Sequence, residues 1–204
     1  MEAERSQIQW GLTAIPCEIR RSESRATVSI AVAPARELVS GETVLYLGRQ
    51  YRLKIELDSS EVGPLTLEQG WLRLGVPGLI EEPHRAGYVR AALVDWYVRR
   101  AKIRLPERVG TWAETLGVAV PRVLIREPKM RWGSCHPSGI VRLNWRIVQA
   151  PSRVVDYVVA HELCHLIHEG HGRAFWTTLG RAMPDYEMQR ARLREMGGAA
   201  GLVR

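Results

Sequence analysis

One helix in this sequence is apolar on nearly every side and still carries two histidines and a glutamate. It begins at Pro151-Ser152, with Ser152 as its predicted N-cap. The residues that surround it with apolar surface are Val154, Val155, Val158, Val159, Leu163, Leu166 and Ile167. A helix without a polar face is buried in the folded protein. Unpaired polar side chains are costly there, so the ionisable residues of this helix need a specific explanation.

The pattern His161-Glu162-Leu163-Cys164-His165 provides one. Residues four apart lie on one helix face, a turn apart, so both imidazoles can bind one metal ion. Glu162 lies beside them and can take a proton from water without occupying a coordination position, which leaves the open position of a catalytic zinc. We expect His161 and His165 to bind zinc and Glu162 to be the general base that acts on a metal-activated water. The alternative is a pair of core histidines with ordinary hydrogen bonds.

A catalytic zinc ion usually has three protein ligands, and His171 is the predicted third. It follows His165 after five residues, which is the spacing of the pattern H-E-x-x-H-x-x-G-x-x-H. Glycines flank His171 on both sides and can turn the chain. The internal glycine of that pattern is His168 here. On a continuing helix, His168 would lie roughly 10 Å along the axis from His161, so we expect it to be a surface or supporting histidine.

The cysteines offer one competing ligand. Thiolate binds zinc well, so Cys135 is an alternative third ligand, but it needs a tertiary contact where His171 needs only a local turn. Cys164 points away from the two helical histidines and is predicted to be buried packing. Three widely spaced cysteines, the third being Cys17, do not indicate a disulfide framework. A reducing compartment fits this usage.

Charge and hydropathy limit the partners. The 204 residues include 29 Lys and Arg against 22 Asp and Glu, a formal net charge of +7, which permits attraction to nucleic acid. The basic residues are scattered through the chain, so nucleic acid is only an alternative partner. Nowhere do about 18 apolar residues follow one another, and the N-terminal residues carry charges of both signs. We therefore expect a cytoplasmic protein without a membrane span.

The first part of the chain, residues 1–80, is predicted to be β-rich. Alternating apolar and polar residues indicate strands at 26–32 and 51–56, and a further strand is expected at 71–76. Gly48, between two such runs, predicts a hairpin turn.

The rest of the chain is predicted to be helical and then mixed. From Pro83, apolar residues recur at helical spacing, so residues 81–118 should form a long helix that continues in broken form past Pro106. Residues 119–204 are the predicted zinc-binding catalytic part, and the three parts together should form one compact unit. Within the last part, strands at 122–126 and 140–145 with a turn signal between them favour a hairpin.

The end of the buried helix is also predicted. Gly170 and Gly172 should stop it. A short helix should then run through Trp176, and a charged helix should start near Asp185.

Several motifs in a fixed order resemble the YgjP-like family of predicted metal-dependent hydrolases, which are relatives of the SprT-like zinc metallopeptidases. The motifs span about residues 15 to 195 and are Tyr46-Leu47-Gly48-Arg49-Gln50-Tyr51-Arg52-Leu53, Arg131-Trp132-Gly133-Ser134-Cys135, Leu143-Asn144-Trp145, the segment from Asp156 to His165, His171-Gly172-Arg173-Ala174-Phe175-Trp176 and Met183-Pro184-Asp185-Tyr186. The resemblance implies a zincin-like α+β fold, zinc ligands at His161, His165 and His171, and a base at Glu162. The family commonly has serine where this chain has Gly172, which removes a hydroxyl but no ligand.

The expected function is that of a zinc-dependent metallopeptidase that hydrolyses peptide bonds in a peptide or protein substrate. Residues 131–135 and Asn144 look like the facing wall of the cleft, either as oxyanion donors or, at least as well, as residues that maintain the fold. Two alternatives remain open. A metal-dependent ribonuclease suits a basic chain, but Glu162 argues against it. A non-catalytic adaptor stabilised by zinc would usually have four protein ligands.

Overall fold

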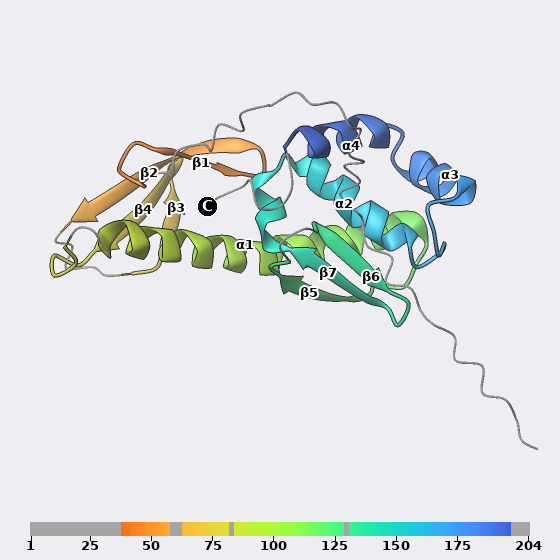
Figure 1. Cartoon of the computed structure of the whole chain (residues 1–204), viewed down its shortest axis with the longest axis horizontal. Helices are drawn as coiled ribbons and strands as arrows, with labels where there is room; N and C mark the ends of the chain where they lie inside the picture. The colour runs from red at the N-terminus through yellow and green to blue at the C-terminus, as the bar shows by residue number, and fades with distance from the viewer. Residues whose placement is uncertain (1–37, 58–62, 82–83, 129–130, 197–204) are drawn as a thin grey trace, which may run out of the picture.

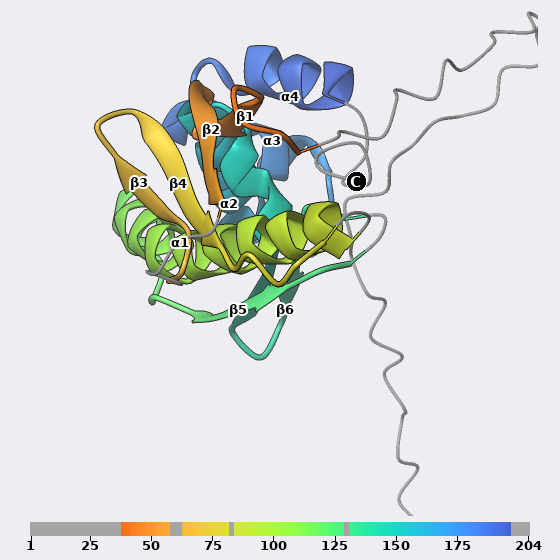
Figure 2. The same ribbon diagram turned by 90° about the vertical axis from the view of Figure 1, so that its left-hand side faces the viewer.

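Helix α1 (His84–Leu116) runs along two separate β-sheets (Figure 1). The structure is a computed structural model of the whole chain, and it describes residues 38–57, 63–81, 84–128 and 131–196. The sheets lie on different sides of α1, one beside its N-terminal half and the other beside its C-terminal half (Figures 1 and 2). The predicted strand at 26–32 lies outside the described residues.

The first sheet has the strand order β1-β2-β4-β3. Its strands are β1 (Thr43–Tyr46), β2 (Arg49–Leu57), β3 (Thr66–Glu68) and β4 (Trp71–Val76). β1 and β2 form the predicted antiparallel hairpin, and β2 pairs with β4 in parallel. The turn residues Leu47 and Gly48 both have positive φ, 49° and 77°, which favours glycine at the second of them.

The second sheet has the order β5-β7-β6, with β5 (Arg122–Arg126), β6 (Gly133–His136) and β7 (Ile140–Asn144). A hairpin is present, but its first strand is β6 rather than the predicted strand at 122–126. β6 and β7 are antiparallel, whereas β5 and β7 are parallel. The difference follows from connection length, because the three-residue turn before Ile140 can join only antiparallel neighbours.

Helix α1 corrects the prediction of a broken helix. It is continuous over 33 residues with Pro106 inside it. Pro106 lies on the exposed face, where the missing backbone donor leaves the buried stripe intact. That stripe comprises Val89, Leu93, Trp96, Tyr97, Ala101, Leu105, Val109, Trp112 and Ala113. Burial of this stripe against both sheets outweighs the local cost of the proline.

The buried helix of the sequence is α2 (Ser152–Cys164), which follows the short 3-10 helix η1 (Trp145–Gln149). Every residue of α2 from Val154 to Cys164 is buried. The reason is that α2 contacts α1, β6, β7, α3 (Arg173–Ala182) and α4 (Tyr186–Glu195). The predicted burial is therefore confirmed, and so are the two helices that follow.

The predicted ends of α2 were wrong. Its N-cap residue is Pro151, with no side-chain cap hydrogen bond, so Ser152 is the first helical residue and not the cap. The helix ends at Cys164 with His165 as the C-cap, well before Gly170. Residues 165–172 form turns and bends instead.

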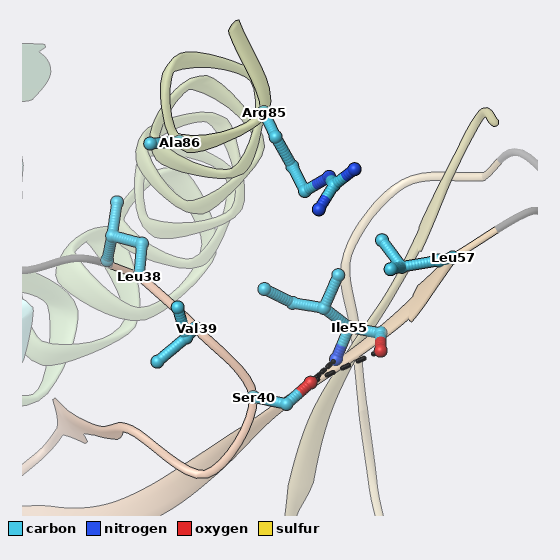
Figure 3. A pocket seen from close by; sticks show the side chains of 7 residues that line it. All are labelled: Leu38, Val39, Ser40, Ile55, Leu57, Arg85 and Ala86. Carbon is cyan, nitrogen blue, oxygen red and sulfur yellow. Dashed lines mark hydrogen bonds between the residues drawn. The ribbon is translucent and has the colours of Figure 1, made fainter. Parts of the chain in front are cut away.

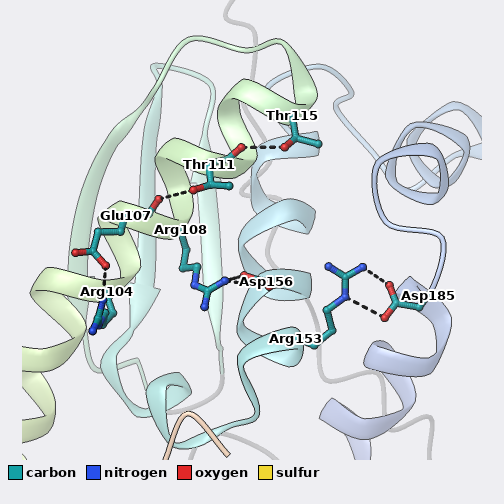
Figure 4. A network of polar contacts seen from close by, with 8 residues as sticks. All are labelled: Arg104, Glu107, Arg108, Thr111, Thr115, Arg153, Asp156 and Asp185. Carbon is teal, nitrogen blue, oxygen red and sulfur yellow. Dashed lines mark hydrogen bonds and ion pairs between the residues drawn. The ribbon is translucent and has the colours of Figure 1, made fainter.

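Two ion pairs hold α2 to its helical neighbours (Figure 4). Arg108 on α1 donates to both carboxylate oxygens of Asp156, at 3.1 and 3.3 Å. Arg153 donates through two nitrogens to the carboxylate of Asp185, the residue before α4. The helix that carries the motif is thereby anchored to α1 and to the start of α4.

A cavity of about 190 Å³ lies between the first sheet and the start of α1 (Figure 3). Apolar side chains line most of it, together with Ser40 and Arg85. The Ser40 hydroxyl accepts a hydrogen bond from the N–H of Ile55 at 2.8 Å and donates to its carbonyl oxygen at 3.2 Å.

None of the described helices is long and apolar enough to cross a membrane.

Candidate metal centre

His161 and His165 lie at the C-terminal end of α2, although the prediction placed both inside a helix that continued to Gly170. His161 is in the last turn, and His165 is the C-cap with φ −70° and ψ −13°. Their ring centroids are 5.1 Å apart with the planes at 77°. Because His165 keeps a helical backbone conformation, the pair retains the one-face geometry of residues four apart.

His171 reaches the same place from the irregular segment after α2. Its ring centroid is 4.9 Å from that of His161 and 4.7 Å from that of His165. Each of the three residues offers a ligand atom, and these atoms all lie within 4.8 Å of one another. The sequence prediction thus named the three histidines that the tertiary structure brings together, and their geometry can hold a metal ion.

A hydrogen bond orients the ring of His165, and the nitrogens of the other two rings converge. His165 Nδ1 lies 3.3 Å from the carbonyl oxygen of His168, so this nitrogen is the donor and Nε2 keeps a free lone pair. His165 Nε2 is buried and has no hydrogen-bond partner among the described residues. The Nε2 atoms of His161 and His171 face each other at 2.9 Å. Such convergent imidazole nitrogens fit a metal ion, which takes the lone pairs that hydrogen bonds leave unused.

Burial favours the neutral, ligating form of the helical histidines. It lowers the pKa of His161 well below its usual value, and the neighbouring His165 and His171 lower it further. Burial also lowers the pKa of His165, although the hydrogen bond to the His168 carbonyl partly offsets this. A metal ligand must be deprotonated, so both shifts favour binding of a cation.

Two aromatic residues of α3, Phe175 and Trp176, pack against the histidine rings. The ring of Phe175 lies 4.8 to 4.9 Å from all three histidine rings, measured between centroids. Trp176 stacks on His171 at 5.7 Å and on Tyr186 of α4 at 5.6 Å. Arg190 lies over the Trp176 ring, with its Cζ 4.8 Å from the centroid. These contacts fix the orientation of His171, which itself lies outside the helices and strands. Reasoning from spacing missed this role, and the only signal for it was the motif that follows His171.

Glu162 points towards β6 and is completely buried. Neither carboxylate oxygen has a hydrogen-bond partner of ordinary geometry among the described residues. Burial raises the pKa of Glu162 to about 8, an effect that Arg131 and the backbone N–H of Cys135 partly offset. That N–H therefore lies near the carboxylate but outside good hydrogen-bond geometry.

Asn144 belongs to the fold rather than to the cleft wall. Its amide nitrogen donates to the carbonyl oxygens of Pro128 and Arg131, at 3.0 and 3.1 Å. Its side-chain oxygen accepts from the N–H of Arg146 at 3.0 Å and caps η1. With its side-chain oxygen and nitrogen engaged in these contacts, this buried side chain is not placed to serve as an oxyanion donor.

The competing residues lie outside the histidine cluster. His168 bonds through Nε2 to the hydroxyl of Thr178, at 2.8 Å. The prediction excluded His168 because a continuing helix would place it about 10 Å from His161. That reason was wrong, because α2 ends at Cys164. Cys135 lies on β6 and is buried; burial, and to a lesser degree Glu162, raises the pKa of its thiol to about 12. Cys164 is also a free, buried cysteine.

A cluster of three histidines beside a buried glutamate is a site of the kind that metal-dependent hydrolases have. Comparison with known families agrees, because the family model of the YgjP-like metallopeptidase domain matches residues 18–196. The chain therefore belongs to the YgjP-like metallopeptidase family and is a metal-dependent peptidase.

No curated protein matches the sequence. Among solved structures, the crystal structure of the metallopeptidase zymogen of Pyrococcus abyssi abylysin is similar over 46% of this chain and 94% of that chain, at 21% identity. The TM-score between the two structures is 0.43.

Proposed function

We propose that this protein is a zinc-dependent metallopeptidase with a zincin-like fold, in which His161, His165 and His171 hold the zinc and Glu162 is the general base. The observation that carries the proposal is the combination of two features. Three imidazoles offer ligand atoms within 4.8 Å of one another, and the buried carboxylate next to the first of them has no hydrogen-bond partner among the described residues.

Zinc is the proposed metal because of the donor set. Among the described residues the cluster has three imidazoles and neither a thiolate nor a fourth protein ligand, a donor set typical of a catalytic zinc site, which keeps one position open. Structural zinc sites usually have four protein ligands, so the cluster argues against an adaptor that holds zinc for stability alone. A zinc ion bound there would lower the pKa of water and polarise the scissile carbonyl.

Glu162 does the proton transfer in this proposal. One carboxylate oxygen accepts the proton of the attacking water, and the same group can pass a proton to the leaving amine nitrogen. The role is supported by the absence of a hydrogen-bond donor in ordinary geometry at either carboxylate oxygen among the described residues. The same residue argues against the ribonuclease alternative, as it does in the sequence.

The remaining parts of the proposal concern organisation and partners. We propose that the parts predicted at 1–80, 81–118 and 119–204 act as one unit, since α1 contacts β4 of the first sheet as well as β5 and α2 of the last part. Free buried thiols at Cys135 and Cys164 support a reducing, cytoplasmic location. The substrate is a peptide or a protein. The net charge of +7 keeps nucleic acid as a second partner to test, by a binding assay at low and high salt.

The test is Glu162→Gln with zinc content and peptide cleavage measured together. We expect the zinc-loaded variant to keep its metal and to lose hydrolysis of a peptide library by at least ~10², because general-base assistance is typically worth 10²–10⁴. Undiminished cleavage by the zinc-loaded variant would remove Glu162 from the mechanism. A wild-type protein that holds no zinc after purification in metal-replete buffer would remove the proposed cofactor.

A further inference from the structure

Gly133 lies so close to Glu162 that a residue with a Cβ atom would clash with the glutamate side chain. A Cβ atom added at Gly133 would lie 2.6 Å from Glu162 Oε1, 2.8 Å from Cγ and 2.9 Å from Cδ. Such distances are shorter than van der Waals contact. Gly133 does not have a positive φ, so its backbone conformation does not require glycine. The reason for glycine here is the space that the carboxylate of Glu162 occupies.

We propose that Gly133 is a positioning residue for Glu162. Because Gly133 has no Cβ atom, the carboxylate of Glu162 can lie against the backbone of β6, an edge strand of the second sheet. Glu162 directly follows His161 on α2. The inference rests on the proposed role of Glu162 as the base, and it means that β6 positions the carboxylate of that base.

The surroundings of Gly133 decide which group would give way to a larger side chain. Gly133 is paired with Leu143 in the antiparallel ladder of β6 and β7. Just before it, the carbonyl oxygen of Trp132 accepts from the N–H of Asn144 at 2.8 Å, and that of Arg131 accepts from the Asn144 side chain at 3.1 Å. The strand is therefore anchored directly beside Gly133.

The carboxylate of Glu162 has no comparable anchor. Both of its oxygens lack a hydrogen-bond partner among the described residues, and rotation about its side-chain bonds is the cheapest response to a new methyl group. A substitution at Gly133 should thus move the base while it leaves the strand, α2 and the three histidines in place.

The experiment compares Gly133→Ala with Gly110→Ala in the full-length, zinc-loaded protein. Gly110 is a suitable control because a Cβ there meets no atom within 4 Å and it lies on α1. For Gly133→Ala we expect kcat on a peptide that the wild type cleaves to fall about 10- to 100-fold, since a base displaced by about 1 Å can cost 10² in rate. KM and the zinc affinity should stay within about threefold of wild type. Gly110→Ala should leave all three unchanged.

Two results would overturn the inference. One is a folded, zinc-loaded Gly133→Ala protein with kcat within threefold of wild type. The other is a loss of zinc affinity as large as the loss of kcat, because the substitution would then act on the ligands. If instead Glu162→Gln itself proves fully active, the proposed function has failed, and the failure is visible without any variant of Gly133.

A stability cycle covers the case in which Gly133→Ala does not fold or no substrate is at hand. Glu162→Ala removes the three atoms that the new methyl group would meet. We expect Gly133→Ala to lower the melting temperature of the metal-free wild type more than that of Glu162→Ala. Equal effects in the two backgrounds would overturn the proposed contact.

Discussion

Among the three histidines of the proposed zinc site, His171 is the one whose position depends most on a few contacts. His161 and His165 are placed by α2, but His171 lies in an irregular segment and is oriented by the ring of Trp176 and by its approach to His161. The side chain of His168 is hydrogen-bonded to Thr178 and takes no part in the cluster. We therefore expect His171 to bind the metal ion and His168, three residues before it, not to bind it.

We predict that His171→Ala raises the Kd for zinc by more than about 100-fold, because loss of a ligand should exceed the 10- to 100-fold effect typical of supporting groups. His168→Ala and Cys135→Ser should change it far less. The measurement is a competitive chelator titration, together with the rise in unfolding free energy on adding zinc, which is about 2.7 kcal/mol at a hundredfold excess over Kd. Loss of zinc by Cys135→Ser with retention by His171→Ala would show that the third ligand is the cysteine.

At the scale of elements, the hairpin of β1 and β2 contacts the start of α2 through Gly48. A Cβ at Gly48 would lie 2.7 Å from the Cα of Pro151, the N-cap residue of α2, and Gly48 has φ +77°. The turn was predicted from the sequence, but this contact with the motif helix was not. Because the atom that it would meet belongs to the backbone, a side chain at residue 48 cannot be accommodated by a rotamer change.

We therefore predict that Gly48→Ala destabilises the protein by about 2–4 kcal/mol, the sum of a strained φ and an overpacked contact. Gly41→Ala is the matched control, because Gly41 has φ +95° and a Cβ there meets nothing within 4 Å. It should cost only about 1 kcal/mol. Urea unfolding of both variants measures the difference. Equal losses would mean that the hairpin does not press on Pro151.

At the scale of the whole molecule, a buried carboxylate makes the global stability of the metal-free protein depend on pH. Burial raises the pKa of Glu162 from 4.5 to about 8. Between these values the folded state binds more protons than the unfolded state, so this group makes the unfolding free energy fall as pH rises. His161 has the opposite sign, since its lowered pKa removes stability as pH drops below its usual value.

We predict that metal-free Glu162→Gln is more stable than the metal-free wild type at pH 8 and that the difference shrinks towards pH 5. The slope of the difference is at most about 1.4 kcal/mol for each pH unit, the value for one proton. The contribution of His161 is the same in both proteins and cancels. Denaturant unfolding at several pH values with a chelator present gives the result, and a difference independent of pH would contradict the buried position of Glu162.

Local patterns were enough to predict much of this protein. The helical period predicted α1 and the buried helix α2, alternation predicted β2 and β4, and the spacing of three histidines predicted the cluster. These features depend on residues close together in the sequence, so their geometry follows from the regular repeat of helix and strand. The family resemblance was also confirmed.

Contacts between distant segments decided the rest. The parallel pairing of β5 with β7, the end of α2 at Cys164 and the continuity of α1 past Pro106 all depend on what each element is packed against. So do the contacts of two residues around the site, Gly133 with Glu162 and Phe175 with the three histidines. The sequence by itself determined the three histidines of the cluster, because they are neighbours along one helix and its exit. Only the tertiary structure decided what surrounds them, because burial and steric fit are properties of segments that meet in space.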